Sequence, residues 1–534
     1  MNNILKIFTS RIFTWIVLML VQILWFVGIF YAFSANFAWV GRLFEILTFF
    51  IVLTIVNKQD NPSYKLAWTI VILALPVLGL ALYALFGSSN ITKKNRKRLA
   101  KVHEHTIGFL YKNENVLSEI GKRSRGASKQ AEYIAKWSGF PIYKNEGIEY
   151  FSSGESVLEP MLKDIRNAKR FIFVEFFIIH EGRFLNSVLE ELEKKAKEGV
   201  EVRFIYDDMG SVSTVGYTFD EKIRKRGIKC KKFNPLKPIV SVVMYNRDHR
   251  KILVFDGEIG YTGGFNLSDE YINEVQRFGY WKDTGVRICG KAVENMTAMF
   301  LEMWQYTDGK VEDISPYFAT TSTKDLKCSF DGNPAEANLE ENAQLIASSR
   351  QKRGYIQPYA DSPLDKEKVG ETVYLNIINR AKDYIYIFTP YLIIDNEMMT
   401  ALCNAAKSGV DVHIICPGIP DKKIIFMMSQ SYYGQLIKAG VHIHEFTPGF
   451  IHAKNFVCDD VIATVGTINL DYRSLYMHFE CGVWIFDSEE IARIKEDAIN
   501  TIAASREIRL EEVQNQSWLK STAQGLLRLF SPLM

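Results

Sequence analysis

Apolar residues are distributed unevenly along this chain of 534 residues. The first ninety positions are mostly apolar, and the runs Ile12–Phe33 and Leu66–Phe86 are long enough to cross a bilayer as helices. Phe37–Val56 is a third apolar run, but it contains two charged residues. We therefore predict that residues 1–90 form a membrane anchor of two to three transmembrane helices. A cleaved signal peptide is the alternative for the first run, although its apolar core is long and no A-x-A site follows it.

A dense cluster of basic residues follows the last apolar run. Its members are Lys93, Lys94, Arg96, Lys97, Arg98 and Lys101. Positive charge beside a span marks the cytoplasmic side, so we predict a basic juxtamembrane linker over residues 91–140 and a catalytic region on the cytoplasmic side of the cell membrane. Lys6 and Arg11 favour an inside N-terminus as well. That requires an even number of spans, so the span count and the N-terminal orientation stay open.

Helical and strand-like patterns alternate beyond about residue 140. Apolar positions recur at helical spacing and are followed by short continuous apolar runs, an order typical of α/β layer folds. In the earlier part the segments are Glu155–Lys169, Phe171–Ile179, Phe184–Glu198 and Val200–Tyr206. In the later part they are Thr372–Lys382, Tyr384–Thr389, Asn396–Lys407 and Val410–Cys416.

The two parts also share short sequences in the same order. Lys197–Val202 matches Lys407–Val412, for example. Glycine after a helix is common in α/β folds, but the order of the shared pieces indicates an internal duplication. We predict a first half over residues 141–335, a second half over 336–510 and a C-terminal amphipathic segment over 511–534.

Charge and composition narrow the function classes. The formal net charge is +3, and the composition is that of an ordinary globular protein. Because there is no global basic excess, nucleic acid is not an expected partner. The cysteines are scattered without a C-x-x-C pair, and the sequence has no H-E-x-x-H motif, so we predict no metal and no other cofactor.

The strongest chemical signal is the pattern H-x-K-x4-D, which occurs once in each half. The two copies consist of His249, Lys251 and Asp256, and of His452, Lys454 and Asp459. Each copy opens a predicted strand, in which residues two apart share a face. The histidine and the lysine therefore point the same way. The aspartate has an odd offset and is expected to brace the turn after the strand.

Further polar residues repeat downstream of each copy. Asn266 and Asn469 end two matching segments with small residues, where the backbone can approach a ligand and the amides can donate to a phosphate. Asp283 and Glu480 follow, and we predict that they orient the histidines. His442 and His444 alternate on a strand near the second motif. They are candidates for lining the pocket, with packing as the alternative.

Two histidines and two lysines at one site suit phosphodiester chemistry. One histidine can attack phosphorus as a nucleophile. The other can protonate the leaving alcohol and then deprotonate the incoming one. Lysine and asparagine side chains can stabilise the charge on the transferring phosphate oxygens.

These residues resemble the phospholipase D superfamily, whose mark is the duplicated H-x-K-x4-D. The surrounding sequence is more specifically similar to bacterial cardiolipin synthases, in the segments Tyr206–Ser211, Asn246–Lys251, Ile259–Asn266, Phe278–Thr284 and Lys65–Gly87. Three features depart from the family pattern. Ile12–Phe33 is additional to the usual two spans, His478 stands where an asparagine is expected, and Thr467 stands where serine is usual.

The resemblance implies a fold and a reaction. The fold is two tandem phospholipase D-like halves, with mixed β-sheets flanked by helices and the active site between them, preceded by N-terminal transmembrane helices. The reaction transfers a phosphatidyl group from one phosphatidylglycerol to another at the lipid bilayer, giving cardiolipin and glycerol. The family's catalytic residues carry over to both motif copies. We expect His249 to be the nucleophile and His452 the general acid and base, and the exchanged roles are the alternative.

Other functions fit part of the pattern. A membrane-bound phospholipase D-type hydrolase, or a transphosphatidylase with another alcohol acceptor, differs only in the acceptor, which the motifs do not specify. A nuclease would favour a basic groove with stacking aromatics, and a non-enzymatic scaffold would not require two intact motifs. Residues 517–534 combine apolar and basic positions, which is typical of an interfacial helix or of a helix packed on the soluble part.

Overall fold

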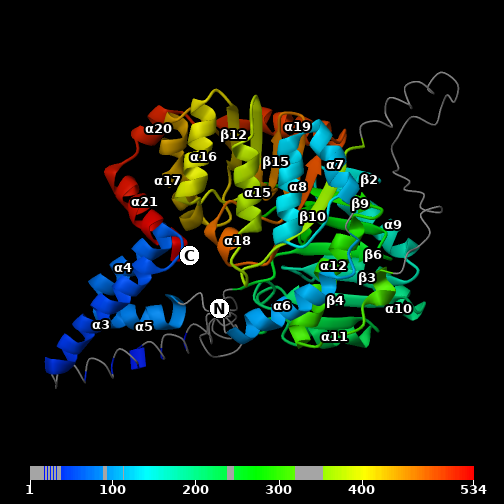
Figure 1. Cartoon of the computed structure of the whole chain (residues 1–534), viewed down its shortest axis with the longest axis horizontal. Coiled ribbons are helices and arrows are strands. Elements are labelled where there is room, and N and C mark those ends of the chain that lie inside the picture. Colours follow the sequence, from blue (N-terminus) through cyan, green and yellow to red (C-terminus); the bar gives the residue numbers. More distant parts are fainter. Residues whose placement is uncertain are drawn as a thin grey trace.

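Two β-sheets, one for each half of the chain, form the centre of the molecule (Figure 1). The computed structural model describes residues 38–87, 93–111, 114–236, 246–318 and 353–533, with a few positions between 17 and 32. The predicted boundary between the halves, at residues 335 and 336, lies outside these described residues.

The sheet of the first half has seven strands in the order β2-β9-β7-β6-β3-β4-β5. Their bounds are β2 (Gly147–Phe151), β3 (Phe171–Phe176), β4 (Glu201–Asp207), β5 (Lys229–Phe233), β6 (Lys251–Phe255), β7 (Ile259–Gly263) and β9 (Gly285–Cys289). The strands β3, β4 and β5 are parallel, and the other pairs are antiparallel, so the sheet is mixed.

The sheet of the second half has nine strands in the order β1-β10-β17-β16-β15-β11-β12-β13-β18, and its edge strand β1 comes from the predicted first half. Their bounds are β1 (Tyr143–Lys144), β10 (Tyr355–Asp361), β11 (Tyr384–Phe388), β12 (Asp411–Pro417), β13 (His442–Phe446), β15 (Asn455–Cys458), β16 (Ile462–Gly466), β17 (Glu480–Phe486) and β18 (Ser505–Glu507). From β10 to β13 this order repeats that of the first sheet, strand for strand. The duplicated α/β fold predicted from the sequence is therefore confirmed.

Both faces of each sheet are buried, which explains the continuous apolar runs of the strands. In β3, Phe171 and Phe173 join a core that also contains strand residues of the second half, whereas Ile172 and Val174 face the opposite way. The shared core also contains residues of α12 (Val293–Asp308) and α19 (Glu490–Ala503). The two halves thus form one packed body around this core.

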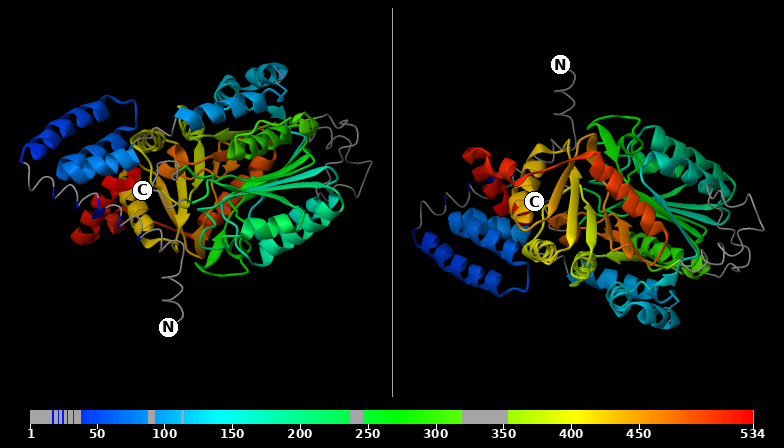
Figure 2. Two further views of the ribbon diagram at one scale, coloured as in Figure 1. Left: turned by 90° about the horizontal axis from the view of Figure 1, so that it is seen from below. Right: turned by 90° about the horizontal axis from the view of Figure 1, so that it is seen from above.

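Other helices cover the outer faces of the two sheets, as the two views of Figure 2 show. Those of the first half are α9 (Glu155–Asn167), α10 (Arg183–Lys197) and α11 (Phe219–Lys225). Those of the second half are α15 (Val369–Ile378), α16 (Asn396–Lys407), α17 (Lys423–Lys438) and α18 (Tyr472–Tyr476).

The predicted strand Phe171–Ile179 is too long, because the chain leaves the sheet after Phe176.

The segment predicted as a basic linker contains three helices, α6 (Lys93–Ile107), α7 (Glu114–Arg123) and α8 (Arg125–Trp137). Helix α6 packs on α12 of the first half, and α8 packs on α15 of the second half. Apolar residues of α7 and α8, such as Ile120 and Ile134, are fully buried in the second-half core. The lysines of the basic cluster are exposed on α6, whereas Arg96 donates to the Leu364 carbonyl and Arg98 lies over the Tyr306 ring.

Three N-terminal helices, α3 (Ala38–Asn57), α4 (Pro62–Ala74) and α5 (Pro76–Leu82), lie beside the second half (Figure 1). The predicted span Leu66–Phe86 is not one helix, because Pro76 interrupts it: proline lacks the N–H that a continuous helix needs. A π-helical turn, η1 (Tyr83–Gly87), completes the segment.

Among the described residues, we found no helix with the length and apolar character that crossing a membrane requires. The predicted span Ile12–Phe33 lies mostly outside the described residues.

The chain ends with α20 (Leu510–Gln514), α21 (Trp518–Phe530) and a short 3-10 turn, η5 (Ser531–Leu533). Helix α21 contacts both α17 and α4. The C-terminal segment therefore connects the catalytic body to the N-terminal helices.

Candidate active site

Backbone hydrogen bonds between the halves position both motif histidines. The His249 amide donates to the Phe479 carbonyl at 2.9 Å, beside Glu480. In the symmetric arrangement, the His452 amide donates to the Lys282 carbonyl at 2.7 Å, beside Asp283. The strands β8 (Tyr280–Lys282) and β14 (Gly449–Ile451) pair in parallel just before this second contact. Each histidine segment is thus fixed against the segment of the other half that carries a carboxylate.

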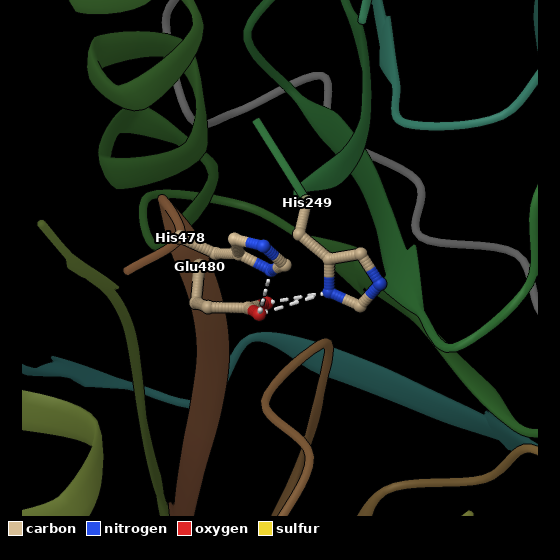
Figure 3. Close-up of side chains that lie close together, drawn as sticks. All are labelled: His249, His478 and Glu480. Carbon is tan, nitrogen blue, oxygen red and sulfur yellow. Dashed lines mark hydrogen bonds and ion pairs between the residues drawn. The ribbon is translucent and has the colours of Figure 1, made fainter. Parts of the chain in front are cut away.

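The side chains form two crossed histidine–carboxylate pairs. His249 Nδ1 lies 2.9 Å from Glu480 Oε1, and His452 Nδ1 lies 2.8 Å from Asp283 Oδ2. Figure 3 shows the first pair, with Glu480 pointing at the near nitrogen of His249. A carboxylate on Nδ1 orients the ring and leaves Nε2 for chemistry. Asp283 and Glu480, predicted to orient the histidines, occupy the positions that this role requires.

Both motif lysines are buried beside the histidines. Lys251 Nζ donates to the His249 carbonyl at 2.6 Å, and Lys454 Nζ donates to the His452 carbonyl and lies 2.8 Å from His452 Nδ1. Loss of hydration lowers the pKa of Lys251 to about 8 and the pKa of Lys454 to about 7. A phosphate near these ammonium groups would restore their charge, so the site is suited to an anion.

The two histidine–carboxylate pairs differ in protonation. Burial lowers the pKa of His452 to about 4, and the charge of Lys454 adds to this effect. Burial alone would raise the pKa of Asp283, but His452 and Lys454 outweigh it and lower that pKa. In the other pair, burial and nearby Lys251 hold the pKa of His249 well below its usual value, while burial raises the pKa of Glu480 to about 8. At neutral pH the His249–Glu480 pair therefore holds a second proton, on Glu480, more readily than the His452–Asp283 pair does on Asp283.

The motif aspartates lie away from the histidines and brace the strand ends. Asp256 accepts the backbone N–H groups of three successive residues, Lys169 to Phe171. Asp459 accepts those of Lys382 to Tyr384 in the same way. Both aspartates have positive φ angles, of 57° and 52°. These contacts confirm the bracing position that strand alternation predicts for them.

Arg250 follows the same alternation of side chains along the strand and lies on the opposite face. It lies between His249 and Lys251 in sequence, points away from them and is fully buried. Its Nε donates to Glu175 at 2.7 Å and to Asp248 at 3.3 Å. This charged group anchors the strand that carries the catalytic pair.

The two predicted phosphate-binding asparagines have hydrogen-bond partners within the protein. Asn266 accepts the Ile178 N–H and donates to the Tyr271 hydroxyl at 2.7 Å. Asn469 donates to Asp471 at 3.0 Å. A substrate phosphate would have to take over these donors, so their phosphate-binding role stays a prediction.

Several residues at the site gave no clear signal in the sequence. The ring centroid of Phe177 lies 4.9 Å from that of His249, and the rings of Tyr271 and Trp281 lie 5.3 and 5.6 Å from that of His452. These aromatic walls explain part of the burial that lowers the histidine pKa values. Phe177 follows directly after β3, so the end of an apolar run was the only available hint.

His478, which stands where the family pattern has an asparagine, also lies in the site. Its ring centroid is 5.6 Å from that of His249, and its Nδ1 is 3.8 Å from Glu480 Oε1 (Figure 3). The period-two spacing from Glu480 was the signal that could have found it. Asp207, at the end of β4, also contributes, because it accepts the Asp248 N–H at 3.1 Å next to His249.

Among the described residues, two groups have ligand atoms close enough to hold a metal ion. One is the active-site set of His249, His478 and Glu480, and the other is Asp411, His413 and His442.

A cavity of about 300 Å³ between α4, α16, α17 and α21 contains none of the predicted site residues.

Comparisons with known proteins found described families for both halves and for the N-terminal segment. The family described as "Cardiolipin synthase, PLD-like domain" matches residues 161–304 and 374–501, one segment in each half. The family described as "Phospholipase_D-nuclease N-terminal" matches residues 46–88. A solved phosphatidylserine synthase of Haemophilus influenzae Rd KW20 has a TM-score of 0.55 at 15% identity, covering 76% of this chain and 99% of that one. At this identity the likeness concerns the fold alone.

Similar sequences extend over nearly the whole chain. A protein of Streptococcus mutans named "Uncharacterized protein" is 42% identical over 90% of this chain and 99% of its own length. Cardiolipin synthase 1 of Bacillus anthracis is 33% identical over 93% of this chain and 94% of its own length. Cardiolipin synthase 2 of Staphylococcus epidermidis is 32% identical over 92% of this chain and 96% of its own length. The chain therefore belongs to the cardiolipin synthase family of the phospholipase D superfamily.

Proposed function

We propose that this protein is a cardiolipin synthase, a phosphatidyltransferase that converts two phosphatidylglycerol molecules into cardiolipin and glycerol. The crossed pairs His249–Glu480 and His452–Asp283 are the observation that carries the proposal, because they present two oriented imidazoles beside two lysines. Family membership supports the same reaction. The nearest alternative, a hydrolase or a transphosphatidylase with another alcohol acceptor, would use the same residues.

The reaction takes place in two displacements. In the first, Nε2 of one histidine attacks the phosphorus of phosphatidylglycerol, and the bond from phosphorus to the glycerol oxygen breaks. The second histidine gives its proton to that oxygen, so glycerol leaves as a neutral alcohol. In the second displacement, this histidine takes the proton from a hydroxyl of another phosphatidylglycerol. That oxygen attacks phosphorus, the phosphorus–nitrogen bond breaks and cardiolipin is released.

The lysines and asparagines have a supporting role in this proposal. Lys251 and Lys454 stabilise the negative charge on the phosphate oxygens in both displacements. Asn266 and Asn469 bind the same oxygens through their amide groups once substrate displaces their present partners. Asp256 and Asp459 act on the reaction only through the backbone that they hold.

The roles of the two histidines follow from the family resemblance, which makes His249 the nucleophile and His452 the general acid and base. The protonation of the site favours the reverse order, because ionised Asp283 keeps a proton on His452 Nδ1 and leaves its Nε2 lone pair free. Acid quenching during turnover and peptide mapping of the phosphorylated histidine decide between them. A phosphate on His249 supports the family assignment, and a phosphate on His452 reverses it.

We also propose that the protein is a multi-pass protein of the cell membrane, with its catalytic halves on the cytoplasmic side. The apolar runs before residue 90 and the basic residues after them support this topology. Exposed apolar side chains also gather on α3, α4 and α21, among them Trp39, Phe49, Leu66 and Trp518. These helices lie at one end of the molecule (Figure 1), where a bilayer would cover them.

The decisive experiment follows labelled phosphatidylglycerol in membranes that contain the protein. Cardiolipin and free glycerol in equal amounts support the proposal. Phosphatidic acid as the only lipid product would contradict it in favour of the hydrolase. The variants His249→Ala and His452→Ala should both be inactive, whereas His105→Ala, on α6, should retain activity and serves as the matched control.

A further inference from the structure

Three histidines gather at one edge of the second sheet. His413 on β12 and His442 on β13 are direct cross-strand partners, and His444 follows two residues later on the same face. Asp411 and His442 are the first residues of their parallel strands. His442 and His444 were considered as pocket residues in the sequence, but their polar contacts are with His413, Asp411 and Glu507.

The first half has a different chemistry at the equivalent positions. There the cross-strand partners are Arg203 and Lys229, and both donate to Glu201, which corresponds to Asp411. These side chains carry permanent charges and form an ordinary ion-pair cluster. In the second half imidazoles replace both cations, while the carboxylate is kept. The replacement exchanges groups that repel a metal ion for groups that bind one.

The cluster offers three candidate ligand atoms, and neighbouring residues contact them. Asp411 Oδ1 lies 2.8 Å from His413 Nε2 and 3.8 Å from His442 Nε2. The other nitrogen of each ring is also held. His442 Nδ1 lies 2.6 Å from Glu507 Oε1, and His413 Nδ1 lies 2.8 Å from His444 Nε2. Histidines that bind metals usually make such a second contact, which fixes the tautomer that offers a lone pair to the ion.

We propose that Asp411, His413 and His442 bind a divalent transition-metal ion of the Zn²⁺ class, with water completing a four-coordinate shell. Two imidazoles and one carboxylate are a ligand set that Zn²⁺ accepts. Glu507 and His444 orient the ligands. The three ligand atoms lie within 4.8 Å of one another, so small side-chain rotations bring them to zinc-binding distances of about 2.0–2.2 Å.

Such an ion would strengthen the edge of the second sheet. Glu507 lies on β18, the last strand before α20 and α21, and it contacts the ligand His442 directly. A bound metal would therefore link β12 and β13 and hold β18 through Glu507. The site serves stability and is separate from the chemistry of His249 and His452, so it does not depend on the proposed function.

The test uses the full-length protein, purified without a polyhistidine tag and freed of metal by a chelator. Calorimetric titration with Zn²⁺ should give one ion per chain, and Zn²⁺ should raise the Tm. The double variant His413→Arg/His442→Lys copies the cations of the first half, so it should fold but lose both effects. His442→Ala should lose Zn²⁺ binding as well. This variant removes a ligand without adding a charge, so it shows whether the loss of the ligand alone is sufficient.

The active-site group of His249, His478 and Glu480 is the competing site, and His478→Ala separates the two. Zn²⁺ binding that persists in His478→Ala and disappears in the double variant supports the proposal. Binding that disappears in His478→Ala and persists in the double variant would place the ion in the active site and overturn the proposal. The absence of Zn²⁺ binding by the wild-type protein would overturn it too.

Discussion

At the scale of single residues, each motif histidine contacts a carboxylate from the other half of the chain. Glu480 and Asp283 are both fully buried, and each contacts the histidine Nδ1. The sequence identified all four residues but not their pairing. Strand alternation also separated the motif aspartates from the histidines correctly. Phe177 and His478 lie outside the repeated motifs, and only the structure placed them beside His249, although the spacing of His478 from Glu480 was an available signal.

Replacing Glu480 with Gln should lower kcat by about 10²–10⁴-fold, because an amide cannot give a proton to His249 or take one from it as a carboxyl group does. The Tm should stay close to that of the wild type, since glutamine has the same shape and burial raises the pKa of Glu480 to about 8. Activity assays and thermal denaturation measure the two effects. Unchanged turnover would remove Glu480 from the mechanism.

The activity should fall as the pH rises through about 7 to 8. The pKa of Lys454 is lowered to about 7 and that of Lys251 to about 8, both by burial. A lysine is charged below its pKa, so both lose the charge that attracts phosphate as the pH increases. The pH profile of kcat/KM, which reports the free enzyme, should therefore decline on the alkaline side. A constant kcat/KM between pH 7 and pH 10 would contradict this assignment.

At the scale of elements, the short parallel pair β8–β14 joins the two halves at the site. Gly449 pairs with Tyr280, and His452 follows three residues later. A Cβ at Gly449 would lie 2.1 Å from the Tyr280 carbonyl oxygen, so the position requires glycine. This contact was not apparent in the sequence, because neither strand is long or strongly apolar and each needs the other half to exist.

Gly449→Ala should separate β14 from β8 and move His452 away from Asp283. We expect activity to fall at least about tenfold, since small misplacements of catalytic groups are costly. Gly216→Ala is the matched control, because a Cβ there would meet no atom within 4 Å. Equal activity of the two variants, measured at the same folded concentration, would show that the pairing does not position His452.

At the scale of the whole molecule, apolar surface is concentrated on the helices at the two ends of the chain. Helix α21 buries Gln524 and packs Leu527 on the second-half core, but it exposes Trp518, Leu519 and Leu526. The sequence left open whether this segment packs on the body or lies in the membrane interface. The structure shows that one side of α21 packs on the body and that another side is exposed to solvent.

The exposed side of α21 should contribute to membrane binding when residues 1–90, the proposed anchor, are absent. In a chain of residues 91–534, Leu519→Ser/Leu526→Ser should weaken binding to phosphatidylglycerol vesicles by about tenfold or more, because two apolar side chains lose their burial in lipid. Val461→Ser/Ile499→Ser removes two exposed apolar side chains elsewhere and should have little effect. Vesicle sedimentation measures both. Equal loss in the two double variants would exclude a specific role for α21.

The sequence by itself determined the α/β class, the duplication and the residues of both motifs, because periodicity and spacing are local properties of a chain. Only the tertiary structure decided which carboxylate serves which histidine, since that depends on how two distant halves pack around a shared core. It also decided that the basic segment after residue 91 forms helices, because their apolar sides need partners from both halves. The grouping of Asp411, His413 and His442 likewise depends on strand register, which no local pattern specifies.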